Sequence, residues 1–152
     1  MIHLTSILVP VDFSAHSKKA FHYALAFARQ FGAKLFLLHV VEPVIYPSEL
    51  GYIPIEMEAL QQNVLASATE RLRTMVAADL PSDLPAERLV RLGAPYLEIT
   101  AAARELKVDL LVIATHGYTG LKHVVLGSTA ERVIRHAPCP VLTVREREHD
   151  FA

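Results

Sequence analysis

Short apolar runs alternate with helical hydrophobic stripes along the whole chain. The runs are continuous and rich in Val, Ile and Leu, which is typical of strands buried on both faces of a sheet. Such strands are predicted at residues 6–11, 34–41, 88–92, 110–115 and 141–144. Because parallel neighbours need a helix-sized connection, this alternation predicts a single α/β domain with a doubly wound open sheet of five parallel strands and four helices.

The connecting helices are predicted from apolar residues that recur every three or four positions and from their end signals. Ser14 is expected to cap the first helix, Gly32 to end it, and Pro95 to occupy the first turn of the third. Prolines and a glycine predict a long loop over residues 42–54. The expected buried stripes are Ala20, Ala24, Phe27, Ala28 and Phe31; Met57, Leu60, Val64, Ala68, Leu72 and Met75; Ile99, Ala102, Ala103 and Leu106; and Ala130, Val133, Ile134 and Ala137.

Composition narrows the class of protein. The chain has 152 residues, 52% of them hydrophobic, so we expect one domain over residues 1–146 and a solvated tail over residues 147–152. The formal net charge is −1 and no run of like charges occurs, so neither nucleic acid nor a membrane is an expected partner. Cys139 is the only cysteine, which excludes an internal disulfide and fits a cytoplasmic location.

No metal site or catalytic residue is expected. The eight histidines lack the spacing of a compact ligand set, and no second cysteine can join Cys139 in a metal cage. His39, at the end of the second predicted strand, is expected to be a hydrogen-bonded core residue. No Ser, His and acid combination stands out as a triad, so we assign no catalytic residue.

Two strand ends carry candidate chemistry. Residues 10–14 follow the first strand, and residues 114–128 follow the fourth. In open α/β sheets, ligands bind beyond the carboxyl ends of the strands where the strand order reverses, so neighbouring first and fourth strands would place both segments on one crevice. Glycines in the second segment let backbone N–H groups approach an anion, and a helix N-terminus follows them.

Structural alternatives stay open for the same residues. Ser128 and Glu131 match a capping box, in which both side chains satisfy free N–H groups without a ligand. Asp12 alternatively braces its loop, and Gly117 alternatively turns the chain. A P-loop is excluded because no lysine follows Gly127, and the dinucleotide pattern G-x-G-x-x-G is missing.

Three motifs occur together in a fixed order. They are Ile7-Leu-Val-Pro-Val-Asp12-Phe-Ser14, Leu37-Leu-His-Val40, and Ala114-Thr-His-Gly117 followed after nine residues by Gly127-Ser128. With Cys139-Pro-Val-Leu-Thr-Val144 as the closing strand, this arrangement resembles the universal stress protein family over essentially the whole chain. The resemblance implies a Rossmann-like sheet of the adenine nucleotide alpha hydrolase type, with strand order 3-2-1-4-5.

The resemblance also implies a ligand and a partner. In ATP-binding members, the residue matching Asp12 holds the adenosine and the backbone matching Val40 meets the adenine edge, while amides of the glycine loop and the next helix hold the phosphates. The implied nucleotide-binding set is Pro10, Val11, Asp12, Val40, Ala114, His116, Gly117, Gly127, Ser128, Thr129 and Ala130. Mg²⁺ or Mn²⁺ would enter only through the phosphates. A homodimer is implied through antiparallel pairing of the last strand, at Val141, Leu142, Thr143 and Val144.

The function implied by the resemblance is a stress-response or signalling module that binds ATP, ADP or AMP. One departure from the family pattern is Ala114, which replaces the first glycine of the loop, so that its methyl group could crowd the ribose or the α-phosphate. Lys122 or His123 would supply a countercharge. Two alternatives stay open: a slow nucleotide hydrolase, and a dimeric adaptor that binds no nucleotide.

Overall fold

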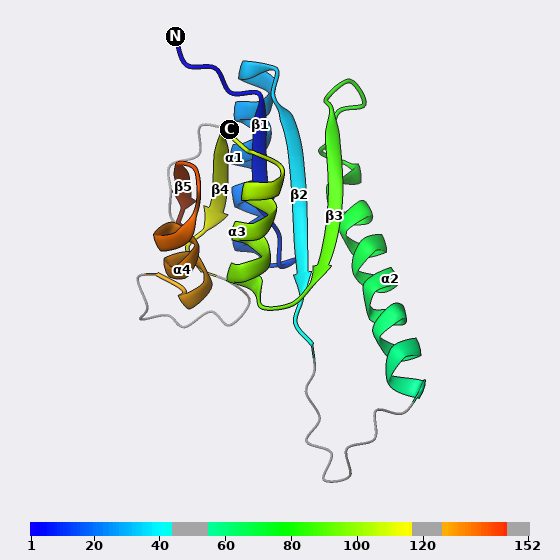
Figure 1. Ribbon diagram of the computed structural model, residues 1–152. Helices are drawn as coiled ribbons and strands as arrows, with labels where there is room; N and C mark the ends of the chain where they lie inside the picture. Colours follow the sequence, from blue (N-terminus) through cyan, green and yellow to red (C-terminus); the bar gives the residue numbers. More distant parts are fainter. Residues whose placement is uncertain (44–54, 117–125, 146–152) are drawn as a thin grey trace.

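The computed structural model describes residues 1–43, 55–116 and 126–145, and places them in a five-stranded sheet with helices on both faces (Figure 1). Every pair of neighbouring strands is parallel, as the sequence pattern predicts, and the strand order is 3-2-1-4-5, as the family resemblance implies. The elements are β1 (Ser6–Pro10), α1 (Ala15–Phe31), β2 (Lys34–Val41), α2 (Ile55–Ala77), β3 (Ala86–Leu92), α3 (Pro95–Glu105), β4 (Leu110–Ala114), α4 (Ser128–His136) and β5 (Val141–Val144).

The two faces of the sheet support separate apolar clusters because successive side chains of a strand point in opposite directions. Ile7 and Val9 of β1 pack with residues of α1 and α2, whereas Leu8 packs with residues of α3 and α4. All three are fully buried. The central strands are therefore covered on both faces, which explains why their sequences are continuously apolar.

The helix ends follow the signals in the sequence. Ser14 Oγ accepts a hydrogen bond from Ser17 N at 3.1 Å and caps α1, and Gly32 ends the helix in the left-handed conformation with φ +67°. Pro95 lies in the first turn of α3. These three predictions are confirmed.

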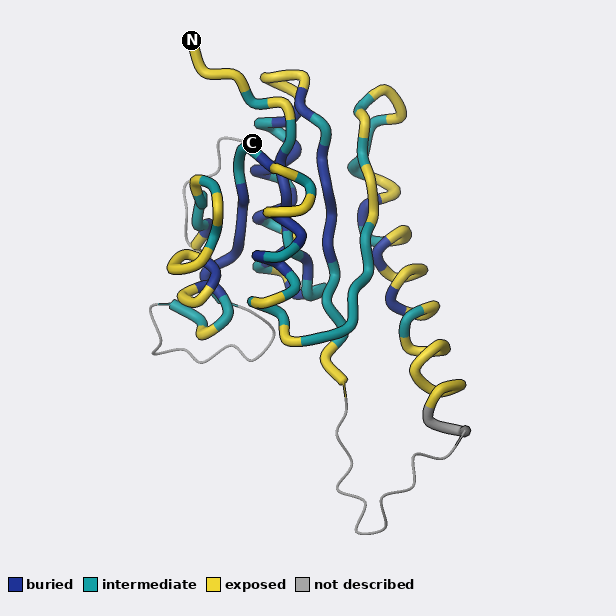
Figure 2. Tube along the Cα trace, in the orientation of Figure 1, coloured by how far each residue is buried: buried dark blue, intermediate teal, exposed yellow. Residues whose placement is uncertain are grey.

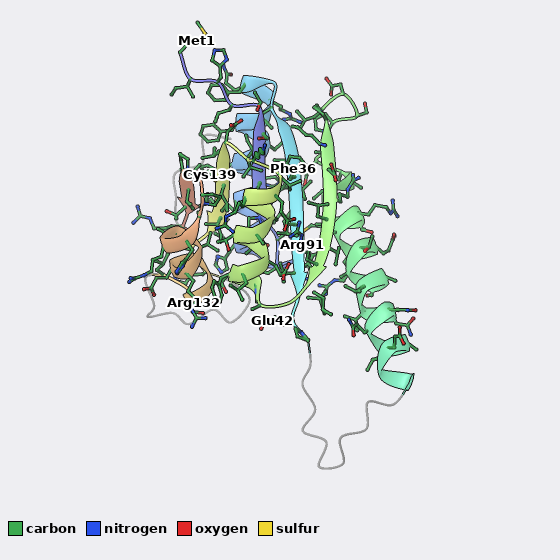
Figure 3. All side chains as sticks on the ribbon, viewed as in Figure 1. Met1, Phe36, Glu42, Arg91, Arg132 and Cys139 are labelled. Atoms are coloured by element: carbon green, nitrogen blue, oxygen red, sulfur yellow. The ribbon has the colours of Figure 1, made fainter. Side chains whose placement is uncertain are left out.

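Ion pairs connect the edge strand β3 to α3. Arg91, which is labelled in Figure 3, forms an ion pair with Glu105 at 2.6 Å and lies 3.7 Å from Glu98, and both glutamates are on α3. This contact holds α3 against the carboxyl half of the sheet, where the helix borders the cavity described below.

Several residues of the predicted buried stripes are exposed. On α2, Leu60 and Val64 are 50% and 42% exposed, and burial begins only at Ala68. The first half of α2 extends beyond the carboxyl edge of the sheet, so no strand lies under it (Figures 1 and 2). Phe31 and Ile134 are also exposed, since each lies near the end of its helix.

Some sequence predictions fall outside the described residues. These are most of the predicted loop over residues 42–54, the side chain of Met57, and the tail over residues 147–152. Among the helices within the described ranges, none is long and apolar enough to cross a membrane.

Candidate functional site

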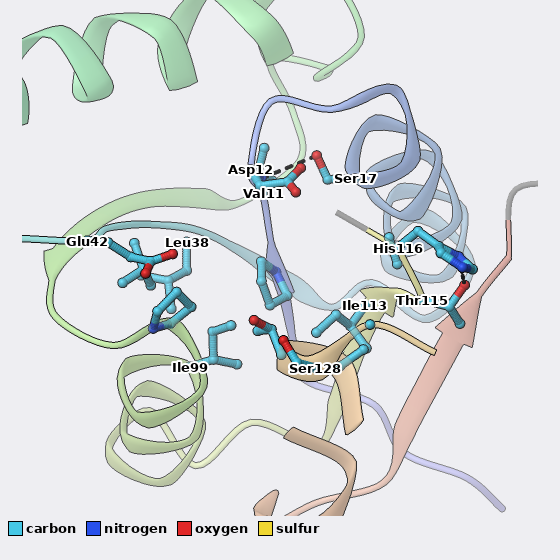
Figure 4. A pocket seen from close by; sticks show the side chains of 17 residues that line it. Val11, Asp12, Ser17, Leu38, Glu42, Ile99, Ile113, Thr115, His116 and Ser128 are labelled. Atoms are coloured by element: carbon cyan, nitrogen blue, oxygen red, sulfur yellow. Dashed lines mark hydrogen bonds between the residues drawn. The ribbon is translucent and has the colours of Figure 1, made fainter. Parts of the chain in front are cut away.

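A cavity of about 340 Å³ opens where the strand order reverses, at the carboxyl ends of β1 and β4 (Figure 4). Every residue of the predicted nucleotide-binding set that the structure describes lines this cavity. These residues are Pro10, Val11, Asp12, Val40, Ala114, His116, Gly127, Ser128, Thr129 and Ala130. Gly117, Lys122 and His123 lie outside the described residues.

Asp12 forms one end of the cavity and is held by the start of α1. Its Oδ1 accepts hydrogen bonds from Ser14 N, at 3.0 Å, and from Ser14 Oγ, and its own N–H donates to Ser17 Oγ at 3.3 Å. Asp12 therefore does brace its loop, as the structural alternative predicts. The same bonds hold its carboxylate in one place at the rim, ready to accept hydrogen bonds from a ligand hydroxyl.

The start of α4 forms the opposite end of the cavity. Gly127 is the N-cap, and its N–H donates to Thr115 O at 2.6 Å, which joins the helix start to the end of β4. A Cβ at residue 127 would lie 3.0 Å from that carbonyl oxygen, so glycine permits this close approach.

The capping box predicted for Ser128 and Glu131 is not formed. Ser128 is the first residue of the helix rather than its N-cap, and among the described residues no side chain caps α4. The first-turn amides of Ser128, Thr129 and Ala130 thus belong to a helix start with no side-chain acceptor within the described ranges, in residues that line the cavity. Such a helix start favours an anion, because unpaired N–H groups and the helix dipole act together.

Apolar side chains form the walls between these two ends. The lining residues that the sequence reasoning missed are Ser17, Leu38, Glu42, Pro95, Ile99, Ile113 and Thr115. Glu42 follows β2 directly and could have been found by applying the strand-end argument to the second strand as well. Pro95 and Ile99 could not have been found in this way, because they line the cavity only through the packing of α3 against the sheet.

Ala114 is 8% exposed and packs in the apolar cluster shared with α1, together with Val112 and Val144. Its neighbour Ile113 belongs instead to the cluster on the side of α3 and α4. The alternation of the strand therefore turns the Ala114 methyl group toward α1, away from the face that carries Ile99 and Ala130.

The charges at the cavity are uneven. Asp12 and Glu42 contribute carboxylates, and no lysine or arginine lines it within residues 1–43, 55–116 and 126–145. The His116 side chain lies beside α1, where its ring centroid is 6.0 Å from that of His16, and its Nδ1 is 3.0 Å from Thr115 Oγ (Figure 4). An anion in this cavity would therefore depend on backbone amides more than on side-chain cations.

His39 supports the other side of Val11. Its Nδ1 lies 2.7 Å from Val11 O, which matches the expectation of a hydrogen-bonded residue, although the side chain is only half-buried. Burial lowers the pKa of His39 below its usual value, and the nearby Arg71 charge lowers it further, whereas the bond to the Val11 carbonyl and the Asp12 carboxylate raise it.

No metal site emerges from the protein's own side chains in the described ranges, because they contain no group of three His, Cys, Asp or Glu residues that could hold an ion. Cys139 is half-buried, and burial raises the pKa of its thiol, which keeps the thiol protonated.

Known proteins are similar to this chain in sequence and in fold. A model described as the universal stress protein family matches residues 3–145. A relative in Thermus aquaticus, described as the universal stress protein in the QAH/OAS sulfhydrylase 3' region, is 36% identical over 140 residues, which cover 92% of this chain and 98% of the relative.

Solved structures agree with the sequence comparison. Hypothetical protein MJ0577 of Methanocaldococcus jannaschii has a TM-score of 0.83 at 26% identity, over 97% of this chain and 100% of that one. A universal stress protein in complex with cAMP has a TM-score of 0.63 at 26% identity, over 95% of this chain and 98% of that one.

Proposed function

This chain belongs to the universal stress protein family, and from that membership we propose that it binds an adenine nucleotide, ATP, ADP or AMP, in the cavity between Asp12 and the start of α4. Asp12 accepts hydrogen bonds from the adenosine, and the backbone of Val40 meets the adenine edge. The amides of Gly117 and of the first turn of α4 hold the phosphates. Binding serves a stress-response or signalling role in the cytoplasm.

The main support for this proposal is that one cavity joins two chemically different ends, a carboxylate and the N-terminus of a helix. The α4 start has no side-chain cap from the described part of the chain and suits a phosphate, while the Asp12 carboxylate at the other end suits hydroxyl or amine donors. Apolar walls from Leu38, Ile99 and Ile113 suit a flat base. The related structure in complex with cAMP supports the same class of ligand.

The position of Ala114 supports binding rather than loss of the site. Its methyl group packs with the α1 cluster, so the departure from the glycine pattern adds no bulk on the side of α3 and α4. Mg²⁺ or Mn²⁺ would be held by the nucleotide phosphates, which bring their own oxygen ligands. The chain's part in binding is then to orient the nucleotide and to exclude water from its base.

Calorimetric titration of the purified chain with AMP, ADP and ATP, each with and without Mg²⁺, tests the proposal. We expect saturable binding of at least one nucleotide, and we expect Asp12→Ala to weaken it about 10- to 150-fold, since a hydrogen bond to a charged group contributes about 1.5–3 kcal/mol. Asp83→Ala is the matched control, because Asp83 is an exposed carboxylate just before β3, at the opposite edge of the sheet.

Absence of binding by all three nucleotides at millimolar concentration would contradict the proposal and would favour the adaptor that binds no nucleotide. Equal affinity of the Asp12→Ala variant and the native chain would remove Asp12 from the site.

We also propose that the chain forms a homodimer through β5 (Val141, Leu142, Thr143 and Val144), which lies at an edge of the sheet. Pro140 O and Val144 O accept hydrogen bonds from β4, so the alternation of a strand turns the peptide groups of Val141 and Thr143 toward the free edge. Thr143→Pro should therefore remove an outward N–H and dissociate the dimer without breaking the β4 pairing. Sedimentation velocity tests this, and an unchanged mass would contradict β5 as the interface.

A further inference from the structure

The turn between β1 and α1 contains a residue in a conformation that bulky side chains rarely adopt. Phe13, directly after Asp12, has φ +66°. Such a backbone persists only where surrounding contacts hold it, and it is found most often beside functional sites. The contacts of Phe13 therefore bear on how Asp12 is presented to the cavity.

Two side chains hold the Phe13 ring. The guanidinium carbon of Arg71, on α2, lies 4.2 Å from the ring centroid, and the His39 ring centroid lies 4.3 Å from it. His39 is in turn 2.7 Å from Val11 O through its Nδ1. The residues on both sides of Asp12 are thus held by this cluster, Val11 through its carbonyl and Phe13 through its ring.

The cluster faces a second cavity of about 480 Å³ on the α2 side of the sheet. Arg71, Phe13 and His39 line this second cavity and do not line the first. Asp12 lines both, with Val40 and Glu42. Asp12 therefore belongs to a wall between the proposed nucleotide site and the cluster that holds its neighbours.

Arg71 differs from the nearby Arg73 of the same helix. The Arg73 guanidinium pairs with Glu70 at 2.7 and 2.9 Å in a solvated ion pair. Among the described residues, no ion pair with a carboxylate is seen for Arg71, and its guanidinium stacks on Phe13 instead. A planar guanidinium is suited to this stacking in a way that a lysine ammonium is not.

We infer that Arg71, Phe13 and His39 are positioning residues for nucleotide binding, which hold the Asp12 carboxylate in place from the α2 side of the sheet. Arg71 holds the Phe13 ring, Phe13 keeps the turn in its left-handed form, and His39 holds the Val11 carbonyl. This inference rests on the proposed nucleotide function, and it extends the site to a helix whose residues do not line the nucleotide cavity.

The test measures the turn and the affinity separately, in Arg71→Ala and in the matched control Arg73→Ala. Without nucleotide, we expect faster amide hydrogen exchange at Asp12 and Ser14 in Arg71→Ala, because these two N–H groups bond within the turn. With AMP, we expect a two- to five-fold rise in Kd, about the effect of losing one exposed cation–π contact. Arg73→Ala should change neither quantity.

Substitutions of Phe13 separate positioning from general stability. Phe13→Leu, which keeps bulk but removes the aromatic face, should raise the Kd as Arg71→Ala does, and adding Arg71→Ala to it should have no further effect. Phe13→Tyr, which keeps the aromatic face, should bind AMP with native affinity. The urea midpoint of Arg71→Ala should stay near the native value because Arg71 is exposed.

Unchanged exchange at Asp12 and Ser14 in Arg71→Ala would overturn the inference, as would faster exchange with an unchanged Kd. If the native chain binds none of AMP, ADP and ATP, the proposed function fails, and the exchange measurement still decides whether the cluster controls the Asp12 turn.

Discussion

Two helices begin at the same edge of the sheet, α1 after β1 and α4 after β4, and their N-termini are built in opposite ways. At α1, Ser14 caps the helix and Asp12 braces the turn. At α4, the N-cap is Gly127, and no side chain in residues 1–43, 55–116 and 126–145 accepts from the first-turn amides. The first end satisfies its polar groups within the chain, whereas the second leaves them to a ligand or to water.

This difference shows how one fold obtains both rigidity and a binding site from the same kind of connection. Every strand–helix junction in an α/β sheet points a helix N-terminus at the carboxyl edge, and a side-chain cap there makes the helix amides unavailable to an anion. The closed end at α1 holds Asp12 in place. The open end at α4 gives up the stability of a side-chain cap, which is typically about 1 kcal/mol.

The largest expected effect comes from closing the open end. Gly127→Asp places a carboxylate where it can cap the α4 amides and repel a phosphate, so AMP or ATP affinity should fall about 10- to 100-fold. Calorimetric titration measures the loss. Gly127→Ala is the matched control, since it adds the same Cβ, 3.0 Å from Thr115 O, without the charge. Equal losses in both variants would attribute the effect to the Cβ alone and contradict the electrostatic account.

An intermediate effect on folding stability should come from removing the hydroxyl at each helix start. Ser14→Ala removes the α1 cap and should lower the free energy of unfolding by about 1 kcal/mol. Ser128→Ala removes a hydroxyl that caps nothing, so stability should change by less than about 0.5 kcal/mol. Urea denaturation of both variants measures the contrast. A loss for Ser128→Ala as large as that for Ser14→Ala would show that both ends are capped.

The smallest expected effect is a pH dependence of folding stability that comes from His39, beside the start of α1. Burial lowers the pKa of folded His39, so its neutral form stabilises the fold. That contribution is complete above the unfolded pKa of about 6.5 and is lost as the pH falls toward the lower folded pKa. Urea midpoints at about pH 7.5 and about pH 5 should therefore differ more for the native chain than for His39→Gln. An identical pH dependence in both chains would exclude His39 as its source.

Much of the fold was predictable because burial constrains the sequence strongly. Residues 7–11 and 110–114 are continuously apolar since both faces of a central parallel strand are covered, and such runs alternating with helical stripes led to the α/β sheet. The strand-end argument then selected Asp12 and Gly127, which line one cavity. The strand order came from the family resemblance and is confirmed.

Periodicity failed where a helix leaves the sheet. Leu60 and Val64 lie on the same helical stripe as the buried Leu72, but the first half of α2 runs beyond the carboxyl edge of the sheet. A stripe records which face of a helix is apolar, whereas burial depends on what the rest of the chain places against that face.

The sequence by itself determined the order of the elements, the residues that follow the strand ends and the family, because these depend on local pattern and on motifs. Only the tertiary structure decided how those residues are used. Gly127 rather than Ser128 occupies the N-cap position of α4, because the Gly127 N–H donates a hydrogen bond to Thr115 O at the end of β4. Likewise, Phe13 keeps its left-handed backbone beside Arg71 and His39, which come from two other elements. Such contacts join residues far apart in the chain, and no local propensity records them.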